Sequence, residues 1–144
     1  MKQKESICFN LKTSWYTVAR MYNSNGSPFE LSASIGYVLL NIDKTEGTTA
    51  TQIAALIGME STSLTRMLKT LEDKKLIIKK QDIKDKRAVK IFLTEQGMIK
   101  REISKKTVKN FNKKVREEVS KEKIDVFFEV MEIINKIAEK NYID

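Results

Sequence analysis

The chain of 144 residues contains no histidine, one cysteine, one proline and five glycines. The absence of histidine removes the commonest general base and the commonest metal ligand in proteins. The single cysteine, Cys8, excludes an intramolecular disulfide framework, and no Cys-x-x-Cys pair or glycine-rich phosphate-binding loop is present. We therefore expect no catalytic residues, no metal site, no cofactor and no enzymatic activity.

Long apolar runs are missing as well. No stretch of about 18 apolar residues is available to span a membrane. The first ten residues, MKQKESICFN, lack the apolar core and small-residue cleavage site of a signal peptide. These features predict a cytoplasmic protein without a membrane partner.

Positive charge is concentrated in the middle of the sequence. The 27 Lys and Arg residues exceed the 19 Asp and Glu residues, for a formal net charge of +8. Residues 1–60 are neutral, residues 61–93 and 94–116 each carry +6, and residues 117–144 carry −4. A solvated lysine-rich surface is one interpretation, but this clustering favours a polyanionic partner.

Helical periodicity covers most of the chain, with a predicted loop at residues 23–28. Thr48 or Thr49 can cap a short helix that carries Ile53, Leu56 and Ile57. Gly58 then supplies a tight turn before a helix at residues 61–74.

The helix at 61–74 has two different faces. Leu64, Met67, Leu68 and Leu71 recur at helical spacing and predict a core-facing side. The opposite side carries hydroxyls and long cations, which suit base edges and phosphates. Two strand candidates follow at 76–80 and 88–93, joined by the polar segment 82–87. This order is the outline of a winged helix-turn-helix DNA-binding domain.

The final part of the chain predicts two more helices. Thr94 can cap a long lysine-rich helix, and the last helix spans about 121–141. The apolar face of the last helix is wider than a helix packed on one side needs. Its excess predicts contact with a second copy of the chain.

Residues 49–97, TATQIAALIGMESTSLTRMLKTLEDKKLIIKKQDIKDKRAVKIFLTEQG, resemble the multiple-antibiotic-resistance regulator (MarR) family. The most specific part is Asp85-Lys86-Arg87, five further residues, Leu93-Thr94 and then Gly97. The resemblance implies a mostly α fold with a small β-wing and one domain over residues 1–144. In it, a winged-helix lobe at about 31–97 lies between dimerisation helices at about 5–23 and 98–141.

The resemblance also implies a homodimeric regulator, commonly a repressor, that binds a pseudo-palindromic operator in double-stranded DNA. Recognition helices enter the major groove, wings reach the minor groove, and a small ligand or an oxidation event releases the DNA. The alternative is a winged-helix protein-interaction module or a non-specific architectural DNA-binding module.

Candidate DNA-binding residues come from the helix pair and the wing, although a solvated helix face would have similar composition. Arg66 can pair with guanine, Lys69 suits phosphate, and Arg87 matches the family's minor-groove arginine. Asp85 can orient the Arg87 guanidinium, perform ordinary turn chemistry, or do both. The full set is Thr51, Gln52, Ser61, Thr62, Ser63, Thr65, Arg66, Lys69, Lys84, Asp85, Lys86 and Arg87.

The resemblance further implies an effector crevice between the dimerisation helices and the DNA-binding lobe, for a small aromatic or carboxylate ligand. Trp15, Tyr16 and Tyr37 can stack on such a ligand or simply fill the core, and Arg20 can pair with a carboxylate. The predicted dimer interface comprises Ile7, Phe127, Val130, Met131, Ile134 and Ile137.

Cys8 raises the question of redox sensing, because one branch of the family senses hydroperoxides through an N-terminal cysteine. That branch has a tyrosine one turn later, where this chain has Lys12. We therefore favour a small hydrophobic role for Cys8 over a sensing role. The lack of histidine argues against the zinc-sensing variant of the family.

Overall fold

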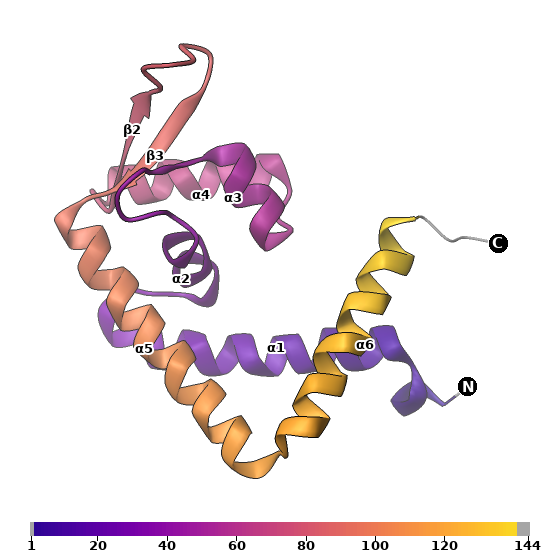
Figure 1. Ribbon diagram of the computed structural model, residues 1–144. Helices are drawn as coiled ribbons and strands as arrows, with labels where there is room; N and C mark the ends of the chain where they lie inside the picture. Colours follow the sequence, from indigo (N-terminus) through magenta and orange to yellow (C-terminus); the bar gives the residue numbers. More distant parts are fainter. Residues whose placement is uncertain (1, 141–144) are drawn as a thin grey trace. The chain divides into compact units, whose positions relative to one another are not determined.

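The computed structural model describes residues 2–140, which are mostly helical with a small antiparallel sheet (Figure 1). The helices are α1 (Ile7–Gly26), α2 (Ala33–Leu40), α3 (Ala50–Ile57), α4 (Ser61–Asp73), α5 (Glu95–Glu118) and α6 (Lys121–Glu139), with 3-10 turns η1 (Gln3–Glu5) and η2 (Ser27–Phe29). The strands are β1 (Thr48–Thr49), β2 (Ile77–Gln81) and β3 (Val89–Leu93). The chain divides into two compact units, with the boundary inside α5 after Thr107.

The core of the first unit joins α2, α3, α4 and the sheet. Leu39, Ile53, Leu71, Ile77 and Ile91 are almost completely buried in one cluster. Replacing any one of these residues with alanine should lower the free energy of unfolding by about 2–5 kcal/mol. The predicted core-facing side of α4 is confirmed, since Leu64, Leu68 and Leu71 are all buried.

The sheet has the order β1-β3-β2 and is antiparallel throughout. The β2–β3 hairpin runs from the pair Ile77↔Leu93 to the pair Gln81↔Val89 and projects beyond α3 and α4 (Figure 1). The predicted strand pair is therefore confirmed. The short strand β1 was not predicted, because two threonines carry too little pattern to indicate a strand.

Thr94 and Gly97 join the sheet to α5. The Thr94 hydroxyl donates to the Lys75 carbonyl (2.6 Å) and accepts from the Gly97 amide (3.0 Å), which confirms the predicted cap. The Thr94 amide donates to the Leu76 carbonyl (3.1 Å). A Cβ on Gly97 would lie 1.9 Å from that carbonyl oxygen, so the close packing of α5 requires glycine here.

The predicted loop at 23–28 is wrong for its first four residues, because α1 continues to Gly26. The Asn25 side-chain amide donates to the Met21 carbonyl (2.8 Å), and the Asn23 side chain accepts from the Ala33 amide (2.8 Å). Gly26 is buried, and a Cβ there would lie 2.4 Å from the Leu31 carbonyl oxygen. These polar and small residues serve helix packing and capping rather than a loop.

The second unit contains the end of α5 and α6. The Ser120 side chain caps α6 by accepting from the Lys123 amide (3.4 Å). Ion pairs Lys121–Asp125 and Lys136–Glu132, both 2.7 Å, follow the i,i+4 spacing that supports a helix. Asn141, the predicted end of this helix, lies outside the described residues.

Candidate nucleic-acid-binding surface

The polar side of α4 is exposed over its whole length. Thr62, Ser63, Arg66 and Lys69 all have exposed side chains, as does Ser61 at the first turn. The Thr65 hydroxyl donates its proton to the Ser61 carbonyl (2.8 Å). Thr65 therefore presents a methyl group and an acceptor oxygen outward, which suits a thymine methyl or a base amino group.

The turn between α3 and α4 is set by Gly58 at φ +66°, a left-handed conformation that favours glycine. The start of α3 is held by a capping box. The Gln52 amide donates to the Thr49 hydroxyl oxygen (3.2 Å), and the Thr49 amide donates to the Gln52 side-chain oxygen (3.0 Å). Gln52 thus has a structural role in addition to its predicted DNA contact, and Thr51 is exposed beside it.

Residues 82–88, which form the wing tip, make a turn that is held by internal hydrogen bonds. The Asp82 amide donates to the Ala88 carbonyl (2.9 Å), and the Ala88 amide donates to the Asp85 carbonyl (3.0 Å). The Asp85 carboxylate accepts from the Arg87 amide (3.0 Å). Within residues 2–140 it forms no ion pair with the Arg87 guanidinium, so the turn interpretation of Asp85 is the one confirmed.

The cations of α4 and the wing are largely uncompensated. Among the described residues of this segment, the only ion pair joins Lys79 to Glu72 at 3.8 Å. Lys80 lies over the Phe92 ring, 5.5 Å from its centroid. Exposed cations without carboxylate partners are available to phosphate groups. They are Arg66, Lys69, Lys84, Lys86 and Arg87.

Aromatic side chains gather between α1 and α2. Trp15 and Tyr37 meet edge to face with centroids 5.4 Å apart, and Tyr22 lies 6.5 Å from Tyr37. Burial raises the pKa of Tyr37. The pKa of Tyr22 is also raised, mainly by burial and to a smaller extent by electrostatic interaction with Tyr37. A cavity of about 500 Å³ is lined by Trp15, Ser34, Tyr37, Ile57, Gly58 and Met59.

The other two predicted effector residues do not line this cavity. Tyr16 and Arg20 are exposed on α1, and the Arg20 guanidinium donates to the Thr17 hydroxyl (3.2 Å). The cavity joins Trp15 and Tyr37 to the α3–α4 turn, in the region where the resemblance placed the effector crevice.

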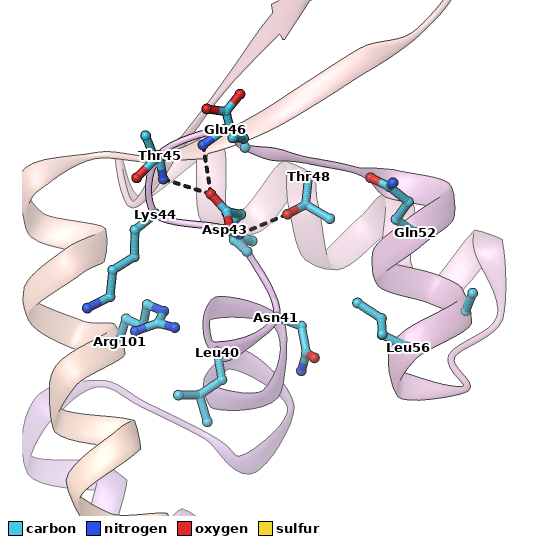
Figure 2. Close-up of a pocket in the computed structure, with 13 residues that line it drawn as sticks. Leu40, Asn41, Asp43, Lys44, Thr45, Glu46, Thr48, Gln52, Leu56 and Arg101 are labelled. Atoms are coloured by element: carbon cyan, nitrogen blue, oxygen red, sulfur yellow. Dashed lines mark hydrogen bonds between the residues drawn. The ribbon is translucent and has the colours of Figure 1, made fainter.

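A second, more open cavity of about 950 Å³ was also not predicted (Figure 2). It lies beside the loop 41–47. The Asp43 carboxylate accepts from the amides of Glu46 (2.7 Å) and Thr45 (2.9 Å), which lowers the pKa of Asp43. Leu56, on α3, is 66% exposed at this cavity.

Arg101 and Lys44 lie on the α5 side of the same cavity (Figure 2). Both pair with Glu102, at 3.1 and 2.9 Å, and Lys44 is the main cause of the lowered pKa of Glu102. Glu102 offsets both cations and Asp43 interacts electrostatically with Arg101, so this cavity lacks the excess charge of the wing.

The exposed side of α6 is apolar. Phe127, Val130 and Ile137 are 56%, 45% and 53% exposed, whereas Met131 and Ile134 are half-buried. Ile7, on α1, is 60% exposed. In an isolated chain these apolar side chains are exposed to water.

Neither a metal cluster nor a membrane-spanning helix occurs in the described part of the chain. No three His, Cys, Asp or Glu side chains gather there to hold a metal ion. Its helices are all too short or too polar to cross a bilayer. Cys8 is a free, exposed thiol, which differs from the small hydrophobic role that we favoured.

These features define a winged helix-turn-helix protein. The family model described as "MarR family" matches residues 31–89. The transcriptional regulator SarZ of Staphylococcus aureus (strain USA300) is 29% identical over 109 residues, which cover 75% of this chain and 74% of SarZ.

Solved structures share the fold at low sequence identity. The S. aureus MepR–DNA complex has a TM-score of 0.83 at 17% identity, covering 94% of this chain and 99% of MepR. CouR of Rhodococcus jostii RHA1, bound to p-coumaroyl-CoA, has a TM-score of 0.82 at 21% identity, covering 93% and 94%. The winged-helix part of the chain is therefore similar to the MarR family, which the sequence of residues 49–97 also resembles.

Proposed function

We propose that the protein is a homodimeric repressor that binds a pseudo-palindromic operator and is released by a small-molecule effector. The observation that carries the proposal is the exposed polar face of α4, followed by a wing tip whose cations, Lys84, Lys86 and Arg87, form no ion pair with the described residues. One domain would comprise the winged-helix lobe, about 31–97, and dimerisation helices at about 5–23 and 98–141. We place its action in the cytoplasm.

Each DNA-binding element has a separate role in this proposal. Arg66 reads guanine in the major groove, and Ser61, Thr62, Ser63 and Thr65 supply short polar contacts. Phosphates are bound by Thr51, Gln52, Lys69, Lys84 and Lys86. Arg87 enters the minor groove, where a narrow A·T-rich segment concentrates negative potential. Asp85 acts through the turn that presents Arg87.

Dimer formation covers the apolar face of α6, with Ile7 contributing from α1. A two-fold related pair of winged helices matches a pseudo-palindromic site. The interface then includes Phe127, Val130, Met131, Ile134 and Ile137.

The effector site is the cavity beside Trp15 and Tyr37. Its aromatic walls suit a flat ligand, and its contact with Gly58 and Met59 links it to the turn that positions α4. CouR, with its bound p-coumaroyl-CoA, is a fold relative with an aromatic acyl ligand. Because Trp15 is the only tryptophan, its fluorescence reports binding directly.

The decisive experiment is fluorescence-anisotropy titration with the DNA upstream of the protein's own coding sequence. A composition-matched scrambled duplex serves as the control, in about 150 mM salt. We expect a preference of about 10³-fold or more, within the range of specific readers. Equal, salt-sensitive binding to both duplexes would support the architectural alternative, and no binding to either would support the protein-interaction alternative.

A further inference from the structure

Ile83 is the most exposed large hydrophobic residue described in the chain. Its side chain is 96% exposed, against 66% for Leu56, the next in order. It stands at the wing tip between Asp82 and Lys84, in a segment that is otherwise charged. A fully exposed isoleucine gains no burial within the protomer, so its side chain is available to a partner.

The turn itself holds Ile83 outward. The Lys84 amide donates to the Asp82 carboxylate (3.0 Å), and the Asp82 amide donates to the Ala88 carbonyl (2.9 Å). The Gln81 side chain adds a bond to the Lys86 carbonyl. Because these hydrogen bonds already order the turn, binding of a partner to Ile83 costs little conformational entropy, which favours Ile83 as a contact residue.

Charged side chains surround Ile83. It borders an open cavity of about 510 Å³, whose charged lining residues are Lys80, Lys84, Lys90, Glu46 and Asp82. The rest of the tip carries Asp85, Lys86 and Arg87, so these groups together comprise five cations and three carboxylates. An apolar side chain in a net-cationic setting matches a DNA groove, where phosphates line the rims and deoxyribose carbons form the walls.

We propose that Ile83 contacts DNA in the minor groove and discriminates A·T from G·C pairs there. This inference rests on the proposed DNA-binding function. A G·C pair places the guanine 2-amino donor in the minor groove, whereas A·T pairs present only acceptors. An apolar side chain over that amino group removes water from it without offering an acceptor, so binding weakens.

The test is a cycle of protein and DNA changes. Wild type, Ile83→Ala and Lys84→Ala are titrated against the operator with each flanking A·T pair replaced in turn by G·C or by hypoxanthine·cytosine. Hypoxanthine lacks the 2-amino group, so its pair with cytosine resembles A·T in the minor groove. Thermal melting of all three proteins confirms that the exposed substitutions leave folding intact.

We expect Ile83→Ala to weaken operator binding about 3- to 30-fold, since only part of the side chain is buried on binding. Wild type should lose about 5- to 100-fold on G·C at the contacted pair and recover on hypoxanthine·cytosine. Ile83→Ala should lose much of that discrimination. The salt dependence of Ile83→Ala should match wild type, whereas Lys84→Ala should lower the slope by about one.

The inference is overturned if Ile83→Ala binds the operator as tightly as wild type, or keeps its full preference for A·T at every flanking pair. Full discrimination in Ile83→Ala would assign the A·T preference to Arg87 alone. Absence of operator-specific binding by the wild type would instead overturn the proposed function, and this inference with it.

Discussion

Arg87 combines an uncompensated charge with a fixed position in a turn. Its amide is held by the Asp85 carboxylate, and its side chain is exposed. The same hydrogen bond shows what residue-level reasoning could predict. Asp at a turn is expected because its side chain bonds an amide two residues on, whereas a guanidinium–carboxylate pair depends on rotamers that sequence spacing does not determine.

Arg87→Ala should weaken operator binding more than ten-fold, because a specific contact contributes about 1–3 kcal/mol. Arg87→Lys is the matched control: it keeps the charge and hence the salt dependence, but a lysine is more strongly hydrated than a guanidinium and should recover only part of the affinity. Titrations at several salt concentrations separate the two effects. Unchanged affinity in Arg87→Ala would remove the wing arginine from the mechanism.

The lowered pKa of Asp43 makes the folding stability of the protein depend on pH. Amide donors from Glu46 and Thr45 hold its pKa below the ordinary value in the folded protein. A lowered folded-state pKa gives stabilisation that is present above the unfolded-state pKa and is lost as pH falls through the folded-state pKa. We therefore expect wild type to lose more stability than Asp43→Asn between pH 7 and about pH 3.

The measurement is the urea midpoint of both proteins at the two pH values. Asparagine keeps an oxygen acceptor for the loop amides but does not titrate in this range. Other carboxylates, including Glu102, are common to both proteins and cancel in the comparison. Parallel losses would show that the Asp43 hydrogen bonds do not couple to folding.

At the scale of elements, periodicity predicted most helices and both long strands, because burial of a regular face is what forms them. Periodicity failed where an element is formed by contacts that do not repeat along the sequence. The end of α1 depends on Asn23, Asn25 and Gly26 packing against the next segment, and β1 depends on pairing with a strand some forty residues later. The two cavities likewise arise from contacts between separate elements.

The α5 junction gives an element-scale prediction. Gly97→Ala should destabilise the protein by about 2–3 kcal/mol or more, because the new methyl group meets the Leu76 carbonyl, which is fixed by the Thr94 amide. Gly58→Asn is the matched control. Nothing lies within 4 Å of a Cβ at Gly58, and asparagine tolerates its positive φ, so we expect a loss below about 1 kcal/mol.

Denaturant unfolding followed by circular dichroism measures both variants. Equal stability losses would contradict the assignment of Gly97 as a close-packing position. The close approach of Gly97 to the Leu76 carbonyl also explains why the motif has a glycine after Leu93-Thr94. This glycine is required by packing and is not itself evidence of DNA binding.

At the scale of the whole molecule, the apolar face of α6 is the feature that a single chain leaves unexplained. Phe127→Glu should convert the proposed dimer to monomers, since Phe127 is 56% exposed and its replacement costs the protomer little. Glu129→Gln, also exposed on α6, is the control and should stay dimeric. Sedimentation velocity gives the mass, and far-ultraviolet circular dichroism checks the helices.

A Phe127→Glu protein that remains a stable dimer would place the interface elsewhere. If it is monomeric, operator affinity should fall as well, because one chain then contacts a single half-site. The width of this face and a second copy as its partner were both predicted from the sequence, although burial of apolar surface alone does not distinguish a second copy from another protein.

The lysines of β2 have a consequence for solubility. β2 is an edge strand of the sheet, and its outer residues include Lys79 and Lys80. Charged side chains on an exposed edge hinder the addition of a strand from another molecule. These two lysines, which are not among the proposed DNA contacts, thus protect the protein from aggregation, and a double Lys79→Thr, Lys80→Val variant should precipitate at concentrations at which wild type stays clear.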